Sequence, residues 1–195
     1  ADDALAEARR LAAGAATLQD LAAAVAAFEG CPLRGMGATQ SVFGRGNPNA
    51  PVLVVGEGPG DDEDRIGQPF VGKAGQLLDR MLAAAGPPGN RAPTPQEQAV
   101  CAPFVERTFA LLKPRAVLLL GAASAKSVLQ VEEGIMKLRG QWKEWRLPEG
   151  AVSAPVMPTL HPAFLLRQPQ AKRQVWSDLL SLAVRLETDS VEDHG

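Results

Sequence analysis

Two short segments about a hundred residues apart hold the side chains best placed for chemistry. In the first, the apolar run Val52–Val55 leads directly into the loop Gly56–Gly60, which contains Glu57. In the second, another apolar run ends at Leu160 and is followed by His161, one of only two histidines. Ligands of α/β proteins bind where such strands end. The pattern therefore predicts a site that combines a carboxylate, an imidazole and backbone amides left accessible by glycine.

The glycine-rich loop lacks the marks of the common nucleotide-binding loops. It has neither the Gly-Lys-Ser or Gly-Lys-Thr ending of a P-loop nor the GxGxxG spacing of a dinucleotide site. The second histidine, His194, lies in a polar tail. We therefore expect a site of another kind, built around Glu57 and His161.

Alternating strands and helices must position this site. Strands are predicted over three short apolar runs, residues 51–55, 116–120 and 155–160, and the first is bounded by proline and glycine, as is typical of a strand covered on both faces. Capping residues and apolar residues at helical spacing predict helices within residues 17–29, 77–85, 94–112, 122–129 and 175–186. Residues 139–150 are interpreted as a short hairpin or a loop.

This alternation predicts an α/β fold, a single three-layer α/β/α domain over residues 1–186 with an open, mostly parallel central sheet of about four strands. Residues 1–30 are predicted as a helical segment packed on that domain, and residues 187–195 as an acidic, flexible tail. Two predicted helices follow each other with no strand between Gly86 and Thr94, although parallel neighbours are normally joined by one crossover each. We infer that one strand is missing from the sequence there.

Composition narrows the class of protein. The sequence has no run of about 18 apolar residues that could span a membrane. Its start is acidic where a secretory signal is basic, so a cytoplasmic protein is expected. Cys31 and Cys101 are too few for a disulfide framework. Their plainest interpretation is two reduced thiols in the core.

Charge is unevenly distributed along the chain. The net charge is -2, but residues 113–186 hold 11 Lys and Arg against 5 Asp and Glu, whereas residues 1–112 hold 9 against 13. The last nine residues hold four acids and no base. A basic face on the C-terminal half is therefore compatible with nucleic-acid binding. Ordinary solvated faces explain the same charges equally well.

Several segments together resemble the family-four uracil-DNA glycosylases. The strongest are the loop Gly56–Gly60 with the acids Glu63 and Asp64, the run Gly67–Asp79, and the segment His161–Arg167. Shorter matches are Pro87–Arg91 with Thr94, Pro95 and Glu97, then Lys113–Pro114, Leu120–Gly121 and Leu138–Gly140. The resemblance covers about Cys31 to Leu186, and it is specific because its first and last segments occur together.

The resemblance implies an enzyme that flips uracil out of DNA and hydrolyses its N-glycosidic bond, leaving an abasic site. Such cleavage leaves positive charge on the sugar and negative charge on the departing base. The implied catalytic residues are Glu57, which orients the attacking water or supports the sugar cation, and His161, a donor to the uracil oxygen that gains charge. The alternatives are a carboxylate that caps its loop and a structural histidine.

Three residues are predicted to bind uracil. Phe70 suits stacking on the flipped base, Gly58 offers its backbone amide, and Asn90 resembles a family position near the uracil pocket. For Phe70 the alternative is a core aromatic that anchors its loop, and for Asn90 it is a structural role in a turn. Glu63 and Asp64 are further candidates, with solvated acids as the alternative.

DNA contacts are expected from the basic half of the chain. Phosphate contacts are predicted for six basic residues: Arg139, Lys143, Arg146, Arg167, Lys172 and Arg173. Leu165 and Leu166 follow His161 closely and are predicted to fill the space that the flipped base leaves, as apolar wedges do. The alternative is that both leucines belong to the core.

The chain departs from the family pattern in two places. Family members have a strand and turn with an asparagine that reads the uracil edge, and this stretch is absent between Gly86 and Pro87. Many members also hold a [4Fe-4S] cluster on four cysteines. Here Cys31 and Cys101 match two of those places, and Phe28 stands where the first cysteine would be. We therefore expect no cluster, no catalytic metal and no other cofactor.

The expected protein is thus a monomeric DNA repair enzyme that acts on uracil-containing DNA, releases free uracil and has no membrane partner. It is expected in the cytoplasm, at the nucleoid when bound to DNA. One alternative is a catalytically weak DNA- or nucleotide-binding relative that has lost the uracil-reading strand. The other is an unrelated α/β small-molecule hydrolase that uses Glu57 and His161.

Overall fold

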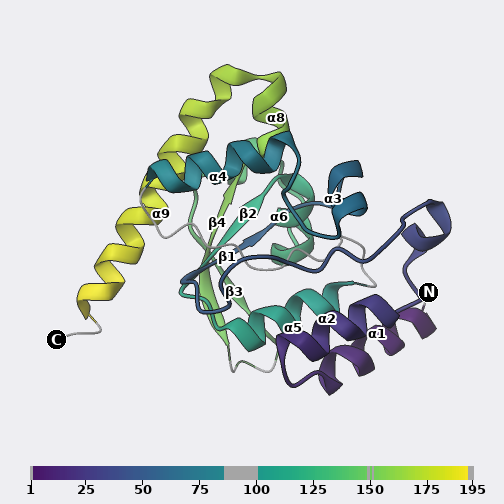
Figure 1. Ribbon diagram of the computed structural model, residues 1–195. Helices are drawn as coiled ribbons and strands as arrows, with labels where there is room; N and C mark the ends of the chain where they lie inside the picture. Colours follow the sequence, from purple (N-terminus) through teal and green to yellow (C-terminus); the bar gives the residue numbers. More distant parts are fainter. Residues whose placement is uncertain (1, 86–100, 149, 151, 193–195) are drawn as a thin grey trace.

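The computed structural model describes residues 2–85, 101–148, 150 and 152–192. Within them the sheet has four strands: β1 (Val52–Val55), β2 (Ala116–Leu120), β3 (Lys143–Arg146) and β4 (Ser153–Thr159). Their order is β1-β2-β4-β3, with β1, β2 and β4 parallel and β3 antiparallel to β4. The prediction of an open, mostly parallel sheet with helices on both sides is confirmed (Figure 1).

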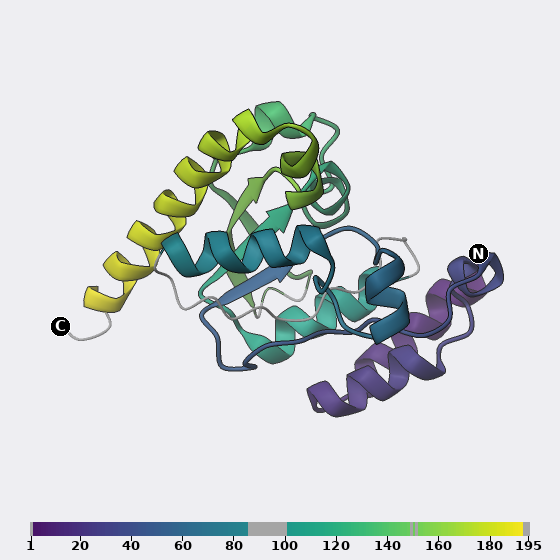
Figure 2. The same ribbon diagram turned by 45° about the horizontal axis from the view of Figure 1, so that its top comes forward.

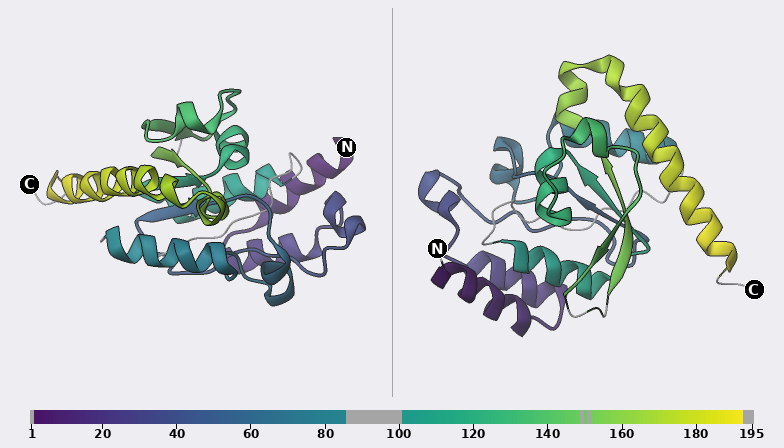
Figure 3. Two further views of the ribbon diagram at one scale, coloured as in Figure 1. Left: turned by 90° about the horizontal axis from the view of Figure 1, so that it is seen from above. Right: turned by 180° about the vertical axis from the view of Figure 1, so that it is seen from behind.

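The layers form because successive side chains of a buried strand point to opposite faces of the sheet. Val52 and Val54 pack on the side of α4 (Lys73–Ala85) and α9 (Lys172–Glu192). Leu53 and Val55 pack on the side of α5 (Ala102–Leu112) and α6 (Ala122–Leu129). Figure 2 and Figure 3 show this layered arrangement from other sides.

The two N-terminal helices form a further layer on α5. α1 (Asp2–Gly14) and α2 (Leu18–Ala27) bury small and apolar side chains against it, and the ring of Phe28 meets that of Phe104 edge to face at 5.3 Å. α2 begins as the sequence predicts, because Thr17 and Asp20 form a reciprocal capping box.

Three elements differ from the sequence prediction. The fourth strand is β3, an antiparallel strand of the 139–150 hairpin. α5 begins at Ala102 with Cys101 as its N-cap, inside the predicted helix 94–112, and the predicted start at Thr94 lies outside the described residues. Pro103 explains this start, because a residue without an N–H fits the first turn of a helix and not its interior. α9 continues to Glu192, so residues 187–192 of the predicted tail are helical.

Several short elements complete the chain: η1 (Pro32–Met36), α3 (Asp61–Ile66), α7 (Ile135–Leu138), α8 (Pro162–Arg167) and η2 (Pro169–Ala171). Asn90 and the place of the missing strand, between Gly86 and Pro87, lie outside the described residues. Among the helices that the structure describes, none is long and apolar enough to cross a membrane.

Candidate active site

Three parallel strands bring their carboxyl ends to the same edge of the sheet. Val55 lies opposite Leu119, and Leu120 lies opposite Thr159. The residues that follow these strands are therefore neighbours in space. Glu57 follows β1, Gly121 follows β2 and His161 follows β4, so the topology assembles the predicted pair from segments far apart in the sequence.

Gly121 lies between the two predicted catalytic residues. A Cβ atom on Gly121 would be 3.0 Å from Glu57 Oε1 and 3.2 Å from His161 Cβ. Its φ of +94° also favours glycine, because side chains rarely adopt that conformation. Gly121 is therefore part of the site, although it was not predicted as a site residue. Its sequence signals are its place directly after a buried strand and the short family match Leu120–Gly121.

His161 is the N-cap residue of α8, and its ring orientation is fixed by the backbone. Nδ1 accepts a hydrogen bond from the Ala163 N–H at 3.1 Å. In the neutral ring the proton is then on Nε2, which becomes a hydrogen-bond donor. Burial lowers the pKa of His161, the Glu57 carboxylate partly offsets this, and Arg167 lowers it further. The ring is therefore neutral at pH 7.

The Phe70 side chain contacts both the hydrophobic core and the candidate site. Its side chain is 8% exposed and packs with α4 and the sheet. The tip of its ring rests on Gly56, where a Cβ atom would be 2.6 Å from Phe70 Cζ. The Phe70 and His161 rings are tilted by 33°, with centroids 6.5 Å apart. Phe70 thus anchors its loop and also lies beside the predicted catalytic histidine.

The carboxylates of Glu63 and Asp64 bind backbone groups of the protein itself. Glu63 accepts hydrogen bonds from the amides of Val71 and Gly72, both at 2.9 Å, and from Gly60 at 3.2 Å. Asp64 accepts from the hydroxyl and the amide of Thr39, and these bonds lower the pKa of Asp64. In this structure both acids brace loops around the site.

A pocket of about 330 Å³ opens at the strand ends. Its lining includes Glu57, Gly121 and His161, together with Phe164, Arg167 and Met136. This volume is at the small end of the range for ligand pockets. Met136 and its neighbour Ile135, both from the short helix α7, line the pocket without having been predicted. Phe70 is not part of this lining and meets the site through Gly56 and His161.

The predicted DNA-contact residues fall into two groups. Lys143, Arg146, Arg167, Lys172 and Arg173 are exposed, as is Leu166 at 46%. Arg146 pairs with Glu144 on the surface. Leu165 is fully buried in the core, which is the alternative interpretation of that residue, because α8 turns it toward α4 and α9. Arg139 is half-buried and forms an ion pair with the buried Asp178, so its guanidinium faces inward.

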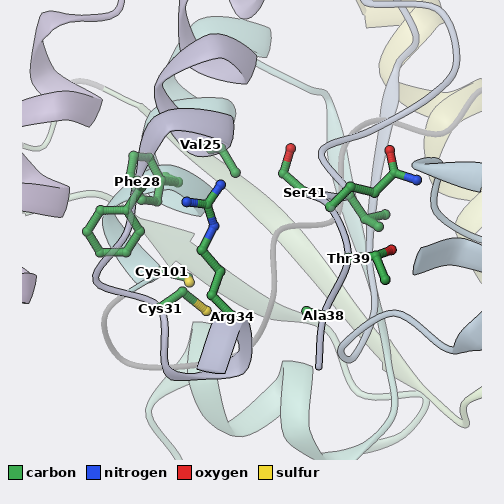
Figure 4. A pocket seen from close by; sticks show the side chains of 11 residues that line it. Val25, Phe28, Cys31, Arg34, Ala38, Thr39, Ser41 and Cys101 are labelled. Carbon is green, nitrogen blue, oxygen red and sulfur yellow. The ribbon is translucent and has the colours of Figure 1, made fainter. Parts of the chain in front are cut away.

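The two cysteines line one pocket of about 240 Å³ beside the N-terminal helices (Figure 4). Phe28 lines the same pocket, is buried and packs on Phe104. A [4Fe-4S] cluster takes four thiolates, whereas the sequence contains two cysteines. Within the part of the chain that the structure describes, no group of three His, Cys, Asp or Glu is placed to hold a metal ion. The residues of this pocket therefore do not fit the cluster.

Comparison with known proteins agrees with this geometry. The family model of the uracil DNA glycosylase superfamily matches residues 43–180. The chain is 37% identical over 153 residues to the type-4 uracil-DNA glycosylase of Thermotoga maritima, covering 70% of this chain and 77% of that protein. It is 33% identical over 181 residues to the type-4 uracil-DNA glycosylase of Pyrobaculum aerophilum, covering 83% and 91%. The chain belongs to the uracil DNA glycosylase superfamily.

Proposed function

We propose that this protein is a uracil-DNA glycosylase that flips uracil out of DNA and hydrolyses its N-glycosidic bond, leaving an abasic site and free uracil. The observation that supports this best is the meeting of Glu57 and His161 across Gly121, at the carboxyl ends of three parallel strands. The relatives named above are type-4 uracil-DNA glycosylases.

The two side chains act on opposite charges of the breaking bond. As the bond between C1′ of the sugar and N1 of uracil breaks, its electron pair leaves with the base and its negative charge spreads onto the uracil oxygens. The Nε2–H of neutral His161 donates a hydrogen bond to one of them. The Glu57 carboxylate stabilises the cationic sugar and orients the water whose oxygen bonds to C1′. The water leaves its hydroxyl group on C1′ and releases one proton to solvent, and the uracil anion takes up one proton from solvent, so that free uracil departs neutral.

The proposal also includes the absence of an iron-sulfur cluster, the oligomeric state and the cellular location. Phe28 and Phe104 line the same pocket as Cys31 and Cys101, and the sequence offers two of the four thiolates that a cluster takes, which supports an enzyme that works without an iron-sulfur cluster. We also propose that it acts as a monomer, in the cytoplasm at the nucleoid, where its DNA substrate lies. Iron analysis of protein purified without oxygen tests the first point, and the expected result is no bound iron.

Base excision is tested with a uracil-containing oligonucleotide that is treated with alkali after incubation, so that abasic sites appear as strand breaks. The protein is expected to yield breaks at uracil and none in the matched thymine oligonucleotide. His161→Ala and Glu57→Ala should each lower turnover by about 100-fold or more with unchanged circular dichroism. An intact uracil oligonucleotide would refute the enzyme and favour the binding-only relative, and wild-type rates in both variants would remove these residues from the mechanism.

A further inference from the structure

Phe70 is held in a backbone conformation that residues with a side chain rarely adopt. Its φ is +55°, in the left-handed region where Cβ crowds the backbone. Such conformations persist where the surrounding structure holds them, and they cluster at functional sites. Two charged side chains hold the peptide groups on either side of Phe70.

Arg45 binds the carbonyl oxygens of two successive residues, Pro69 and Phe70. Its Nε donates to the carbonyl oxygen of Pro69 at 2.7 Å, and its Nη2 donates to that of Phe70 at 2.8 Å. The same Nη2 lies 3.0 Å from Asp79 Oδ2, on α4. Partial burial raises the pKa of Asp79, and the charge of Arg45 offsets part of that rise. Arg45 thus ties two successive carbonyl groups to a helix of the core.

Glu63 binds the two peptide N–H groups that follow Phe70, because its carboxylate accepts hydrogen bonds from the amides of Val71 and Gly72. The backbone of residues 69–72 is therefore held by Arg45 at the carbonyl oxygens of Pro69 and Phe70 and by Glu63 at the two amides that follow. Gly75 lets α4 approach the loop closely, since a Cβ atom there would be 1.9 Å from the Phe70 carbonyl oxygen. From this backbone the Phe70 ring points toward Gly56 and His161.

We propose that Arg45, fixed by Asp79, is a positioning residue of the uracil site, which keeps the Phe70 ring beside His161 in the orientation that stacks on the flipped base. This rests on the proposed function, because it names what orients a ring of that site. Arg45 acts through Phe70, so its effect requires the Phe70 ring.

The first test compares Arg45→Met with Arg65→Met. Arg65 is a matched control, because it is a nearby arginine that also pairs with an aspartate, Asp62, but its side chain is 70% exposed. Arg45→Met is expected to slow single-turnover excision of uracil about tenfold or more and to raise the inhibition constant of free uracil about tenfold, since small misplacements near reacting groups cost this much. Arg65→Met should stay within about twofold in both measurements.

The second test is a double-mutant cycle with Phe70→Ala. Once the ring is gone, Arg45→Met should change the inhibition constant of uracil by less than about twofold, because interacting residues are not additive. A full tenfold effect in the Phe70→Ala background would overturn the positioning role. Arg45→Lys, which lacks the planar fork of arginine, is expected to fall between wild type and Arg45→Met, and it carries the test if Arg45→Met does not fold.

The outcomes separate this role from the proposed function. An active wild type with Arg45→Met equal to Arg65→Met would overturn the role of Arg45 and leave the glycosylase in place. A wild type that leaves uracil in DNA would overturn both. Thermal unfolding of each variant shows whether a slower rate reflects loss of folded protein.

Discussion

At the scale of single residues, the protonation of His161 follows from its surroundings and has a measurable consequence. Burial lowers its pKa, so excision should stay constant as the pH falls through about 6.5, the ordinary value for histidine, and decline only below it. Titration of the His161 imidazole signal by NMR should show a midpoint below 6.5. His194→Gln is the control, because it leaves a single histidine to assign. A decline centred at or above 6.5 would contradict the buried neutral donor.

The same lowered pKa affects stability with a definite sign. Between the folded and unfolded pKa values of His161, the unfolded chain binds more protons than the folded one. The free energy of unfolding should therefore fall as the pH drops through this window. His161→Gln removes the titrating group and should lose less stability over the same range.

Gly121 gives a second prediction at this scale. Gly121→Ala places a methyl group against Glu57 and His161 in a strained backbone conformation. Turnover should fall by about 100-fold, and the protein should lose about 1–3 kcal/mol of unfolding free energy. Gly134→Ala is the matched control, since its Cβ would meet no atom within 4 Å and its φ is -69°. Equal turnover in the two variants would show that Gly121 does not shape the site.

At the scale of elements, buried strands were predictable and short helices were not. β1 and β2 are continuous apolar runs, and β4 is buried over residues 156–159, which is how strands covered on both faces appear. α6 matches its predicted bounds, because a glycine precedes it and its apolar residues follow a helical period. α3, α7 and α8 have six, four and six residues. Such lengths are too short for a helical period to show.

The site was predictable only where it follows a strand. Glu57 and His161 were found because strand ends gather ligand-binding residues. Arg45 binds the carbonyl oxygen of Phe70 from 25 residues away, and no local pattern reveals such a contact. Leu165 and Leu166 are neighbours in sequence with opposite burial, because the face that α8 turns inward is set by its packing and not by its composition.

The buried side chain of Asp178 links β4 to α9, and this link should contribute to the stability of the fold. Asp178 is 2% exposed and accepts hydrogen bonds from the Thr159 hydroxyl at 2.6 Å and from Arg139 Nε at 3.1 Å. Asp178→Ala leaves the half-buried Arg139 without its carboxylate and should cost about 3–5 kcal/mol, measured by urea unfolding. Glu144→Ala breaks an exposed pair with Arg146 and should cost less than about 1 kcal/mol. Similar losses in both would mean that the buried network does not fasten the strand.

At the scale of the whole molecule, the sheet shows where an additional strand would fit. β3 forms one edge, and β1, which pairs only with β2 among the described strands, forms the other. The further strand that the family resemblance implies would pair beside β1, the edge that the described strands leave without a second neighbour. It would then lie next to Glu57 and Phe70, the residues that follow β1 in the sequence. Among the described strands, β1, β2 and β4 by themselves place Glu57, Gly121 and His161 at one edge of the sheet.

The charge of the whole molecule sets how binding should respond to salt. An overall charge of -2 opposes the binding of DNA unless the basic residues gather on one face of the protein. Arg167 is exposed and lines the pocket, and Lys172 and Arg173 begin the helix that follows it. Arg167→Gln should weaken binding of uracil-containing DNA and reduce the slope of log Kd against log salt by about one, the effect of losing one phosphate contact. Arg10→Gln should change neither, because Arg10 is exposed on α1, far from α8 (Figure 1). An equal change of slope in both variants would mean that DNA follows the general charge of the protein and not a face built around the pocket.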